Sequence, residues 1–274
     1  MNKCVARVSP VTRGFSFAYK SFLATCLLLA TFIAAGNARA EDSRKSLIFM
    51  DNSVSLLTGT GFQVPGENIS TVTFEHVSKW KWGDVFGFFD YLDYHSNPTQ
   101  SHSWYGEFSP RLSLTGISLI DLPKGSFVRD VLVSTTWEKG RGGTEALLLG
   151  MAADLNVPGF KFFKTNVYAR KNTSLGDGFD DMQVTLSWSR PFEIGEERFT
   201  IDGFLDYAMG WASQEEWMHL VPQIKWDVGA RWGEPGKVYF GTEIDIWVNQ
   251  FGIKDTPAFN TNQIAASAIL KVHF

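Results

Sequence analysis

The chain has 274 residues, of which 25 are basic and 29 are acidic, so its formal net charge is −4. Such a chain lacks the basic surface that binding to nucleic-acid phosphates requires, which argues against a nucleic-acid partner. Its two cysteines, Cys4 and Cys26, both lie within residues 1–40, so the remainder can form neither a disulfide framework nor a thiolate metal site.

Residues 1–40 have the three regions of a secretory signal peptide in the usual order. Residues 1–20 carry basic groups and no acid, residues 22–35 are largely apolar, and Ala38-Arg39-Ala40 forms a small-residue cleavage site. The apolar run is too short for a membrane anchor, because a spanning helix needs about 20 such residues. We therefore expect export by the general secretory route and cleavage after Ala40. This cleavage leaves 20 basic against 29 acidic residues, a net charge of −9.

Residues 41–274 are predicted to form one all-β domain. Apolar and polar residues alternate with a period of two through most of this region, and clusters of Gly, Pro, Asn and Asp separate the alternating stretches. About twelve strands are expected, at residues 46–58, 68–79, 84–94, 102–115, 127–138, 144–155, 162–172, 181–191, 197–210, 216–228, 238–250 and 261–274.

Two all-β architectures, a soluble sandwich and a transmembrane barrel, fit this alternation. The predicted strands are about eleven to fourteen residues long, whereas sandwich strands average about five or six and a bilayer-crossing strand needs about nine to eleven. The polar face is charged on nearly every strand, as the wall of a wet lumen would be. These features favour a transmembrane antiparallel β-barrel in the lipid of the bacterial outer membrane, with both termini on the periplasmic side. Tryptophans lie mostly near predicted strand ends, where interfacial girdles form, at Trp80, Trp82, Trp104, Trp137, Trp188, Trp211, Trp217, Trp226 and Trp232.

The last stretch, residues 262–274, has one apolar face and one face that carries basic groups. From Ile264 onward, the residues on the parity of Ile264 are all apolar, whereas the other parity includes Lys271 and His273, and the chain ends with Phe274. Taken alone, this stretch is equally compatible with the last strand of a soluble sandwich. An aromatic residue at the end of a long alternating strand is typical of outer-membrane barrels, and we expect the barrel-assembly machinery to recognise the strand through Phe274.

Four stretches of the chain are similar to one known family of membrane channels. They are Thr73-Phe74-Glu75-His76 with Trp80, Gly83-Asp84 and Phe86 to Asp90; Tyr105-Gly106-Glu107-Phe108-Ser109-Pro110-Arg111-Leu112-Ser113-Leu114; Asn166-Val167-Tyr168-Ala169-Arg170; and Gly203-Phe204-Leu205-Asp206-Tyr207. The second, with the pattern E-x-x-P-R-x-S, is the most distinctive. Together with the last strand, they resemble the Tsx-like nucleoside-specific channel-forming porins, including OmpK-type members, over nearly the whole of residues 41–274. The resemblance implies a twelve-stranded monomeric barrel that passes nucleosides.

The E-x-x-P-R-x-S strand supplies two charged candidates for the lumen. Glu107 and Arg111 share one parity, with Ser109 between them. In a narrow wet lumen these two side chains can bind ribose hydroxyls or base edges by charge-assisted hydrogen bonds. The alternative is that they pair with neighbouring lumen charges and only satisfy the wall. Pro110 has no N–H for the ladder and is expected to mark a bulge.

Aromatic residues beside charged ones on other strands are the second group of lumen candidates. A ring among acids and bases suits a solute with a flat base and a hydroxylated sugar, although rings also simply fill small barrels. Phe89 and Tyr91 are included, but their strand is apolar on both parities, and its facing stays open. The candidate solute-binding residues are Glu107, Arg111, Tyr168, Arg170, Phe204, Asp206, Trp247, Phe89 and Tyr91.

The charged lumen positions nearly balance and predict a weak preference for cations. Facing charges of opposite sign largely neutralise one another, so we expect the preference to be small. The expected acids are Glu107, Asp202, Asp206, Asp227, Glu243 and Asp245, and the expected bases are Arg111, Lys164, Arg170, Lys225 and Lys271.

Other functions also fit such a barrel: a general small-solute porin, or a structural barrel or surface receptor whose loops bind phage or colicins. A lipid hydrolase is a further alternative, because His76-Val77-Ser78 puts a base and a nucleophile on one face of a strand. Ser78 lies near a predicted periplasmic turn, however, whereas a lipase needs the pair at the outer leaflet, with a third group that orients the histidine. We expect no catalytic residue, no metal and no cofactor.

We predict that the mature protein begins at Glu41 and resides in the outer membrane. N-terminal sequencing of the protein from the membrane fraction should begin at this residue, and circular dichroism in detergent should show β-structure. A product in the soluble periplasmic fraction, or a helical spectrum, would contradict the prediction.

Overall fold

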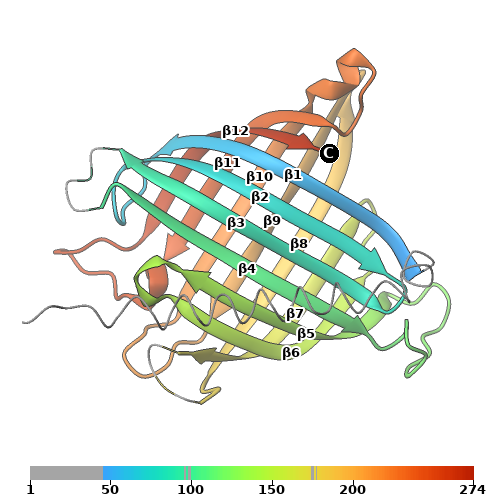
Figure 1. Cartoon of the computed structure of the whole chain (residues 1–274), viewed down its shortest axis with the longest axis horizontal. Helices are drawn as coiled ribbons and strands as arrows, with labels where there is room; N and C mark the ends of the chain where they lie inside the picture. Colours follow the sequence, from blue (N-terminus) through green and yellow to red (C-terminus); the bar gives the residue numbers. More distant parts are fainter. Residues whose placement is uncertain (1–45, 96, 98–99, 174–175, 177) are drawn as a thin grey trace, which may run out of the picture. The chain divides into compact units, whose positions relative to one another are not determined.

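The structure is a computed structural model that describes residues 46–274 except 96, 98–99, 174–175 and 177. The expected signal peptide lies outside the described residues. In the described part the chain forms a closed barrel of twelve antiparallel strands, as predicted (Figure 1). The strands are β1 (Leu47–Thr60), β2 (Asn68–Trp80), β3 (Gly83–His95), β4 (His102–Ser113), β5 (Val128–Gly140), β6 (Glu145–Leu155), β7 (Phe162–Asn172), β8 (Asp181–Ile194), β9 (Glu197–Ala208), β10 (Trp217–Asp227), β11 (Val238–Val248) and β12 (Gln263–His273).

Every strand of the barrel pairs with its neighbours in sequence, and β1 pairs with β12 to close the ring. The closing register begins with Ser53 opposite His273. Beyond it, the Phe274 N–H donates to the Asn52 carbonyl at 2.9 Å, and the Asn52 N–H donates back to the Phe274 carbonyl at 3.3 Å. Closure gives every described strand a partner on each side, as a sheet in the interior of a bilayer requires.

The predicted strand boundaries agree with the observed ones to within about three residues at both ends of every strand. The largest difference is in β8, which was predicted to stop at Pro191 and continues to Ile194. Proline has no N–H for the ladder and is confined to strand edges. The pairing of β8 with β7 ends at Ser189, so Pro191 lies beyond β7 and pairs only with β9.

The bulge predicted at Pro110 was wrong. The register between β4 and β5 is the same before and after this residue. The pairing is only interrupted there, because proline cannot donate to the ladder. The Thr135 hydroxyl donates to the Pro110 carbonyl at 3.2 Å across the interruption. The missing N–H therefore leaves a gap in the ladder without inserting an extra residue.

The two faces of the strands have opposite environments, as the alternation predicted. In β12, Ile269 and Lys271 are buried inside the barrel, whereas Ile264 is 74% exposed outside. Trp217, which was expected in the outer girdle, is only 8% exposed and lies in the lumen. The exposed apolar residues of the outer wall include Leu56, Val72, Phe74, Phe108, Leu112, Trp137, Leu147, Leu149, Met151, Val167, Met182, Ile224, Phe240, Leu270 and Val272.

Strand β3 faces the lumen with its even-numbered residues. Asp84 is buried inside, whereas Phe89 and Tyr91 on the other parity are each 47% exposed on the outer wall. Phe89 and Tyr91 are therefore not lumen residues, and their inclusion among the solute-binding candidates was wrong. Both parities of β3 are apolar because the lumen is itself lined by rings along this strand, at Phe86 and Phe88.

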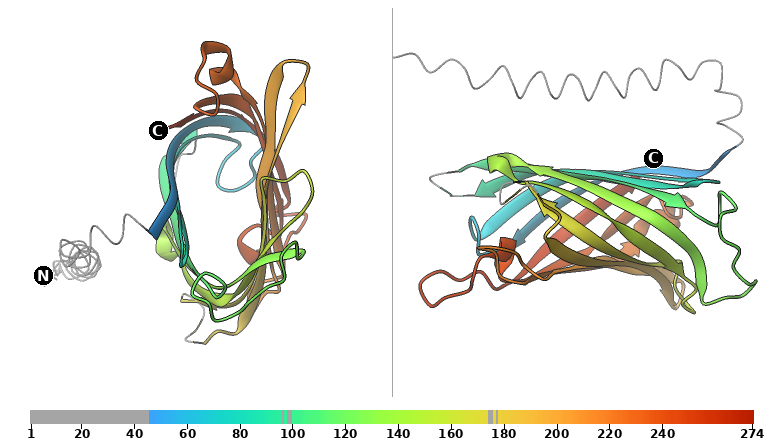
Figure 2. Two further views of the ribbon diagram at one scale, coloured as in Figure 1. Left: turned by 90° about the vertical axis from the view of Figure 1, so that its right-hand side faces the viewer. Right: turned by 90° about the horizontal axis from the view of Figure 1, so that it is seen from below.

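The two ends of the barrel carry different connections. The end that holds residues 47 and 273 is named the terminus end, and the opposite one, with connections such as 61–67 and 249–262, is named the loop end. Seen nearly along its axis, the barrel is oval (Figure 2). Three 3-10 turns lie in the connections, η2 (Arg141–Gly143), η3 (Val228–Trp232) and η4 (Gln250–Gly252). Among the described residues, no helix is long and apolar enough to cross a membrane.

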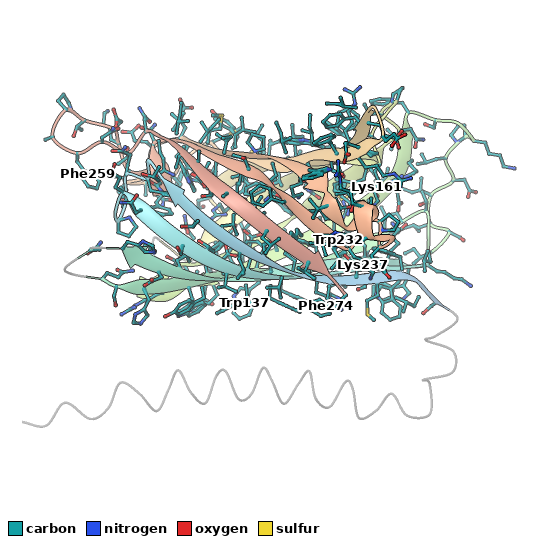
Figure 3. The ribbon with its side chains drawn as sticks, turned by 90° about the horizontal axis from the view of Figure 1, so that it is seen from above. Trp137, Lys161, Trp232, Lys237, Phe259 and Phe274 are labelled. Atoms are coloured by element: carbon teal, nitrogen blue, oxygen red, sulfur yellow. The ribbon has the colours of Figure 1, made fainter. Side chains whose placement is uncertain are left out.

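Deleting Phe274 should lower the amount of folded protein in the outer membrane, because the deletion removes the last backbone pair between β12 and β1. The measurement is the heat-modifiable fraction in electrophoresis of outer-membrane preparations. Phe259→Ala is the matched control, since this ring is also exposed but lies in a connection at the loop end (Figure 3). Equal amounts of folded protein for the two variants would contradict a role in closure.

Candidate functional site

An ionic cluster lies in the lumen at the terminus end. Arg111 of β4 donates to Asp84 of β3 through Nε at 2.8 Å and Nη2 at 2.6 Å, and Nη2 also donates to Asp154 of β6 at 2.9 Å. Arg111, Asp84 and Asp154 are 5%, 3% and 1% exposed. Lys164 of β7 and Lys79 of β2 approach Asp84 to 3.4 and 3.7 Å. Acids and bases alternate in this cluster, so each buried charge has an opposite partner.

The geometry favours the alternative interpretation of Arg111, that it pairs with charges of the barrel wall and does not bind solute. Two of its nitrogens are engaged by carboxylates from two strands, and such forked pairs are directional and strong. Turning the guanidinium toward a solute would leave Asp84 and Asp154 buried without this partner. Arg111 therefore holds β4 to β3 and β6.

A second polar group lies in the loop-end half of the lumen. Arg170 of β7 donates to both carboxylate oxygens of Glu138 of β5, at 2.6 and 2.7 Å, and to Oε1 of Gln183 of β8 at 2.7 Å. The Gln183 amide donates in turn to Asp206 of β9 at 3.1 Å. Glu107 of β4 interacts electrostatically with Glu138, Asp206 and Arg170. Closure of the barrel thus gathers Glu107, Arg170 and Asp206, which are far apart in sequence.

An aromatic group from β9, β10 and β11 lines the lumen beside these charges. The rings of His219 and Trp247 stack with centroids 3.8 Å apart and planes inclined by 12°. Phe204 meets His219 edge-on at 5.1 Å, and Trp217 packs against Trp247 at 5.6 Å. The Arg170 guanidinium lies 5.6 Å from the centre of the Trp217 ring. The aromatic and polar groups therefore form one continuous surface.

The opposite wall, formed by β3 and β4, also presents rings. Phe88 and Tyr105 lie 5.8 Å apart, and the Tyr105 hydroxyl donates to Glu107 at 2.8 Å. Glu107 interacts with Asp206 although β4 and β9 are five strands apart in the barrel order. The loop-end half of the lumen, named the loop-end passage, therefore has rings on both walls and carboxylates from β4 and β9.

Exposure separates the solute-facing candidates from those locked in the wall. Glu107, Phe204, Asp206 and Trp247 are partly exposed to the lumen, whereas Arg170 is 6% exposed and is bonded through Nη1 and Nη2 to Glu138 and Gln183. The first four can touch a passing solute directly. Arg170 acts on them through its neighbours.

Tyr168 occupies the wall between the ionic cluster and the loop-end group. It is 4% exposed, and its ring belongs to a small apolar cluster with Ala146 and Leu148. The Tyr168 hydroxyl lies 2.7 Å from the Ser134 hydroxyl. This placement favours the interpretation that the ring fills the barrel, because its faces are covered.

Four residues of the loop-end passage were missing from the predicted set: Phe88, Tyr105, Trp217 and His219. Tyr105 shares the parity of Glu107, so the alternation of that strand was a usable signal. The facing of Phe88 was hidden by aromatic residues on both parities of β3. His219 lies opposite Trp247 in the register of β10 and β11, which sequence does not give. Within the described residues, no group of three or more His, Cys, Asp or Glu side chains is placed to hold a metal ion.

A closed twelve-stranded antiparallel barrel with an apolar outer wall and a charged lumen is the architecture of an outer-membrane channel. The sequence model of the family described as nucleoside-specific channel-forming protein, Tsx, matches residues 55–274. The chain belongs to this family, as the four motif stretches predicted. No curated protein matches the sequence.

Some solved structures resemble the chain. KdgM porin has a TM-score of 0.48 and 8% identity, over 81% of this chain and 99% of the porin. The translocator domain of autotransporter NalP from Neisseria meningitidis has a TM-score of 0.33 and 10% identity, over 92% of this chain and 97% of that domain. At these TM-scores and identities the likeness carries no argument about the lumen or its solute.

Replacing Arg111 by methionine should lower the free energy of unfolding by about 3–5 kcal/mol, because it leaves buried carboxylates without their partner. The measurement is a urea titration of the protein refolded in lipid vesicles. Arg198→Met is the matched control, since Arg198 and Glu193 form an exposed pair at 3.7 Å, whose loss should change the free energy by less than about 1 kcal/mol. Similar losses for both variants would show that the buried cluster does not stabilise the barrel.

Proposed function

We propose that the protein is a channel through which nucleosides diffuse across the outer membrane, with a weak binding site in the loop-end half of the lumen. The observation that carries the proposal is the aromatic group of Phe204, Trp217, His219 and Trp247 beside lumen carboxylates. The nucleoside-specific description of the family supports it.

The two parts of a nucleoside match the two kinds of group in the passage. A planar base can stack on Phe204 or Trp247, whose rings are partly exposed, since stacking on aromatic side chains tolerates every base. Ribose hydroxyls can donate to Glu107 and Asp206. Arg170 is a positioning residue, because it holds Gln183 against Asp206 and packs over Trp217.

The site should bind weakly, and weak binding suits passage. Twelve strands lie between barrels of about eight, whose interiors are filled, and of about sixteen, which leave an open channel, so solutes must touch the wall. Stacking on one ring contributes about 1–3 kcal/mol, and a few contacts give a Kd in roughly the millimolar to high-micromolar range. Tighter binding would slow the exit of the solute.

The route to the membrane is part of the same proposal. The chain would be exported by the general secretory route, lose residues 1–40, and fold as a monomer with both termini on the periplasmic side. The barrel-assembly machinery would recognise β12 through Phe274, which is 62% exposed beside the closing pair. The charged residues that cleavage would remove are all basic, so the mature barrel would carry a net negative charge.

Adenosine or thymidine should block single-channel current through the refolded protein at lower concentration than a sugar of similar bulk, because only the nucleosides offer a ring that stacks. Phe204→Ala or Trp247→Ala should raise the blocking concentration by about tenfold, which corresponds to the loss of one stacking contact of about 1.4 kcal/mol. The measurement is the current through single channels as a function of solute concentration.

Phe89→Ala is the matched control for these variants, since Phe89 is an aromatic residue on the outer wall of the same barrel. It should leave the blocking concentration unchanged. Equal block by sugars and nucleosides, or equal effects of Phe89→Ala and Phe204→Ala, would make the protein a general small-solute pore.

The channel should prefer cations weakly, because unneutralised acids are concentrated at one end of the lumen. In the loop-end half, Glu107 and Asp206 lie near Arg170 as the main base and Glu243 accepts from the Gln223 amide, whereas the terminus-end acids Asp84 and Asp202 are paired with bases. Reversal potentials under a salt gradient should show the preference, and Glu107→Gln with Asp206→Asn should reduce it. Glu193→Gln, at an exposed strand end, is the control; anion selectivity of the unaltered protein would refute the prediction.

A further inference from the structure

Three polar side chains form a chain of hydrogen bonds on β1 and β2. The Asn52 side-chain oxygen lies 2.9 Å from Nδ1 of His76, and Nε2 of His76 lies 3.2 Å from Oγ of Ser78. The indole N–H of Trp80 donates to the same Oγ at 3.1 Å. The H-x-S spacing by itself offers a base and a nucleophile without a third group. Asn52, directly opposite His76 in the register of β1 and β2, is that third group.

These side chains face away from the lumen. On β2, Phe74 shares the parity of His76 and is 44% exposed on the outer wall. Glu75, on the other parity, forms an ion pair with Lys271 inside the barrel. Asn52 lies opposite His76, and directly paired residues point to the same side of a sheet. The hydrogen-bond chain is therefore on the lipid-facing wall and is independent of the proposed channel function.

The chain of hydrogen bonds also lies at the depth of an aromatic girdle. Trp80 and Trp82 stack beside it with ring centroids 5.7 Å apart, at the terminus end of β2. Tryptophans at such a level mark the boundary between headgroups and hydrocarbon, where the ester bonds of glycerolipids lie. With the termini on the periplasmic side, the site lies at the inner leaflet and not at the outer leaflet that was expected of a lipase. The inner leaflet consists of glycerophospholipids, so it also offers ester bonds at this depth.

We propose that Asn52, His76 and Ser78 form an acyl-hydrolase site for the ester bonds of glycerophospholipids. An amide oxygen on Nδ1 selects the tautomer that carries its hydrogen there, so Nε2 is the basic nitrogen that faces the Ser78 hydroxyl. Polar groups that face lipid must be hydrogen-bonded. That requirement alone does not place an acceptor on one ring nitrogen of His76 and a hydroxyl on the other. Asn52 is the positioning residue, His76 the general base and Ser78 the nucleophile.

The reaction balances without a further reactant except water. The Ser78 oxygen bonds to the ester carbonyl carbon while its proton passes to Nε2 of His76, and the negative charge forms on the former carbonyl oxygen. Collapse breaks the ester C–O bond, and the lysophospholipid leaves with the proton from His76. Water, deprotonated by His76, then releases the fatty acid from Ser78.

Access to the nucleophile is restricted. Ser78 is 3% exposed beneath Trp80, so an ester reaches Oγ only when the Trp80 side chain turns away from the strand. Hydrolysis should therefore be slow, because only a lipid that displaces the Trp80 ring can reach Ser78. Such a restriction is compatible with a barrel that stays in the same membrane as its substrate.

The test uses the mature chain refolded in vesicles of phosphatidylethanolamine and phosphatidylglycerol. A fluorophosphonate probe should label Ser78, as located by mass spectrometry, and fatty acid should be released from the vesicles. Ser78→Ala and His76→Ala should lower this release at least about 100-fold. Asn52→Leu should lower kcat and shift the pH profile while KM stays unchanged, which a merely structural role would not produce.

Ser70→Ala is the matched control. Ser70 lies on the same face of β2 and is 3.0 Å from Nε2 of His95, but Asp93 approaches that same nitrogen, at 3.7 Å, rather than Nδ1. Ser78→Ala must keep its heat-modifiable migration and ion conductance, which shows that the variant folds. Labelling of neither serine, equal labelling of Ser70 and Ser78, or unchanged fatty-acid release by Ser78→Ala would overturn the proposal.

Discussion

Backbone pairing between β1 and β12 is the contact on which the rest of the molecule depends. A bilayer offers no partner for an unpaired N–H or carbonyl, so a β-protein in lipid must close its sheet. Here the two strands that close it come from opposite ends of residues 47–274, and the last residue, Phe274, pairs through its backbone with Asn52. Once the ring is closed, each strand has one face in the lumen and one in lipid, and every other feature follows from this division.

Charge in the lumen serves two different purposes at its two ends. At the terminus end, Arg111 is held between Asp84 and Asp154. Removing one of these residues would leave the others charged and without an opposite partner in a medium of low dielectric constant. At the loop end, acids outnumber bases and the partly exposed Glu107 and Asp206 stand beside aromatic rings. The first arrangement ties the wall together, whereas the second leaves groups free to contact a solute.

Because successive side chains of a strand point to opposite faces, one strand can place functional groups both in the lumen and toward the lipid. On β2, Glu75 contributes to the lumen network with Lys271, while the adjacent His76 lies on the lipid side with Asn52 and Ser78. A channel inside and a hydrolytic site outside would therefore not compete for the same side chains. The two proposals stand on opposite faces of the wall and fail or succeed separately.

The fold class, the twelve strands with nearly their full lengths and the facing of most of them could be predicted from the amino-acid pattern, because the period of a strand and the residues that break it are local properties. It also indicated the family, through motifs such as E-x-x-P-R-x-S. Local pattern was insufficient for β3, where rings on both parities hid that Phe89 faces lipid, and for Trp217, whose position near a strand end resembled that of a girdle residue. Which side chains come together depended on the three-dimensional arrangement: Glu138 with Arg170, His219 with Trp247, and Asn52 with His76. Those contacts depend on closure and on the register between strands, which backbone pairing sets over long sequence separations.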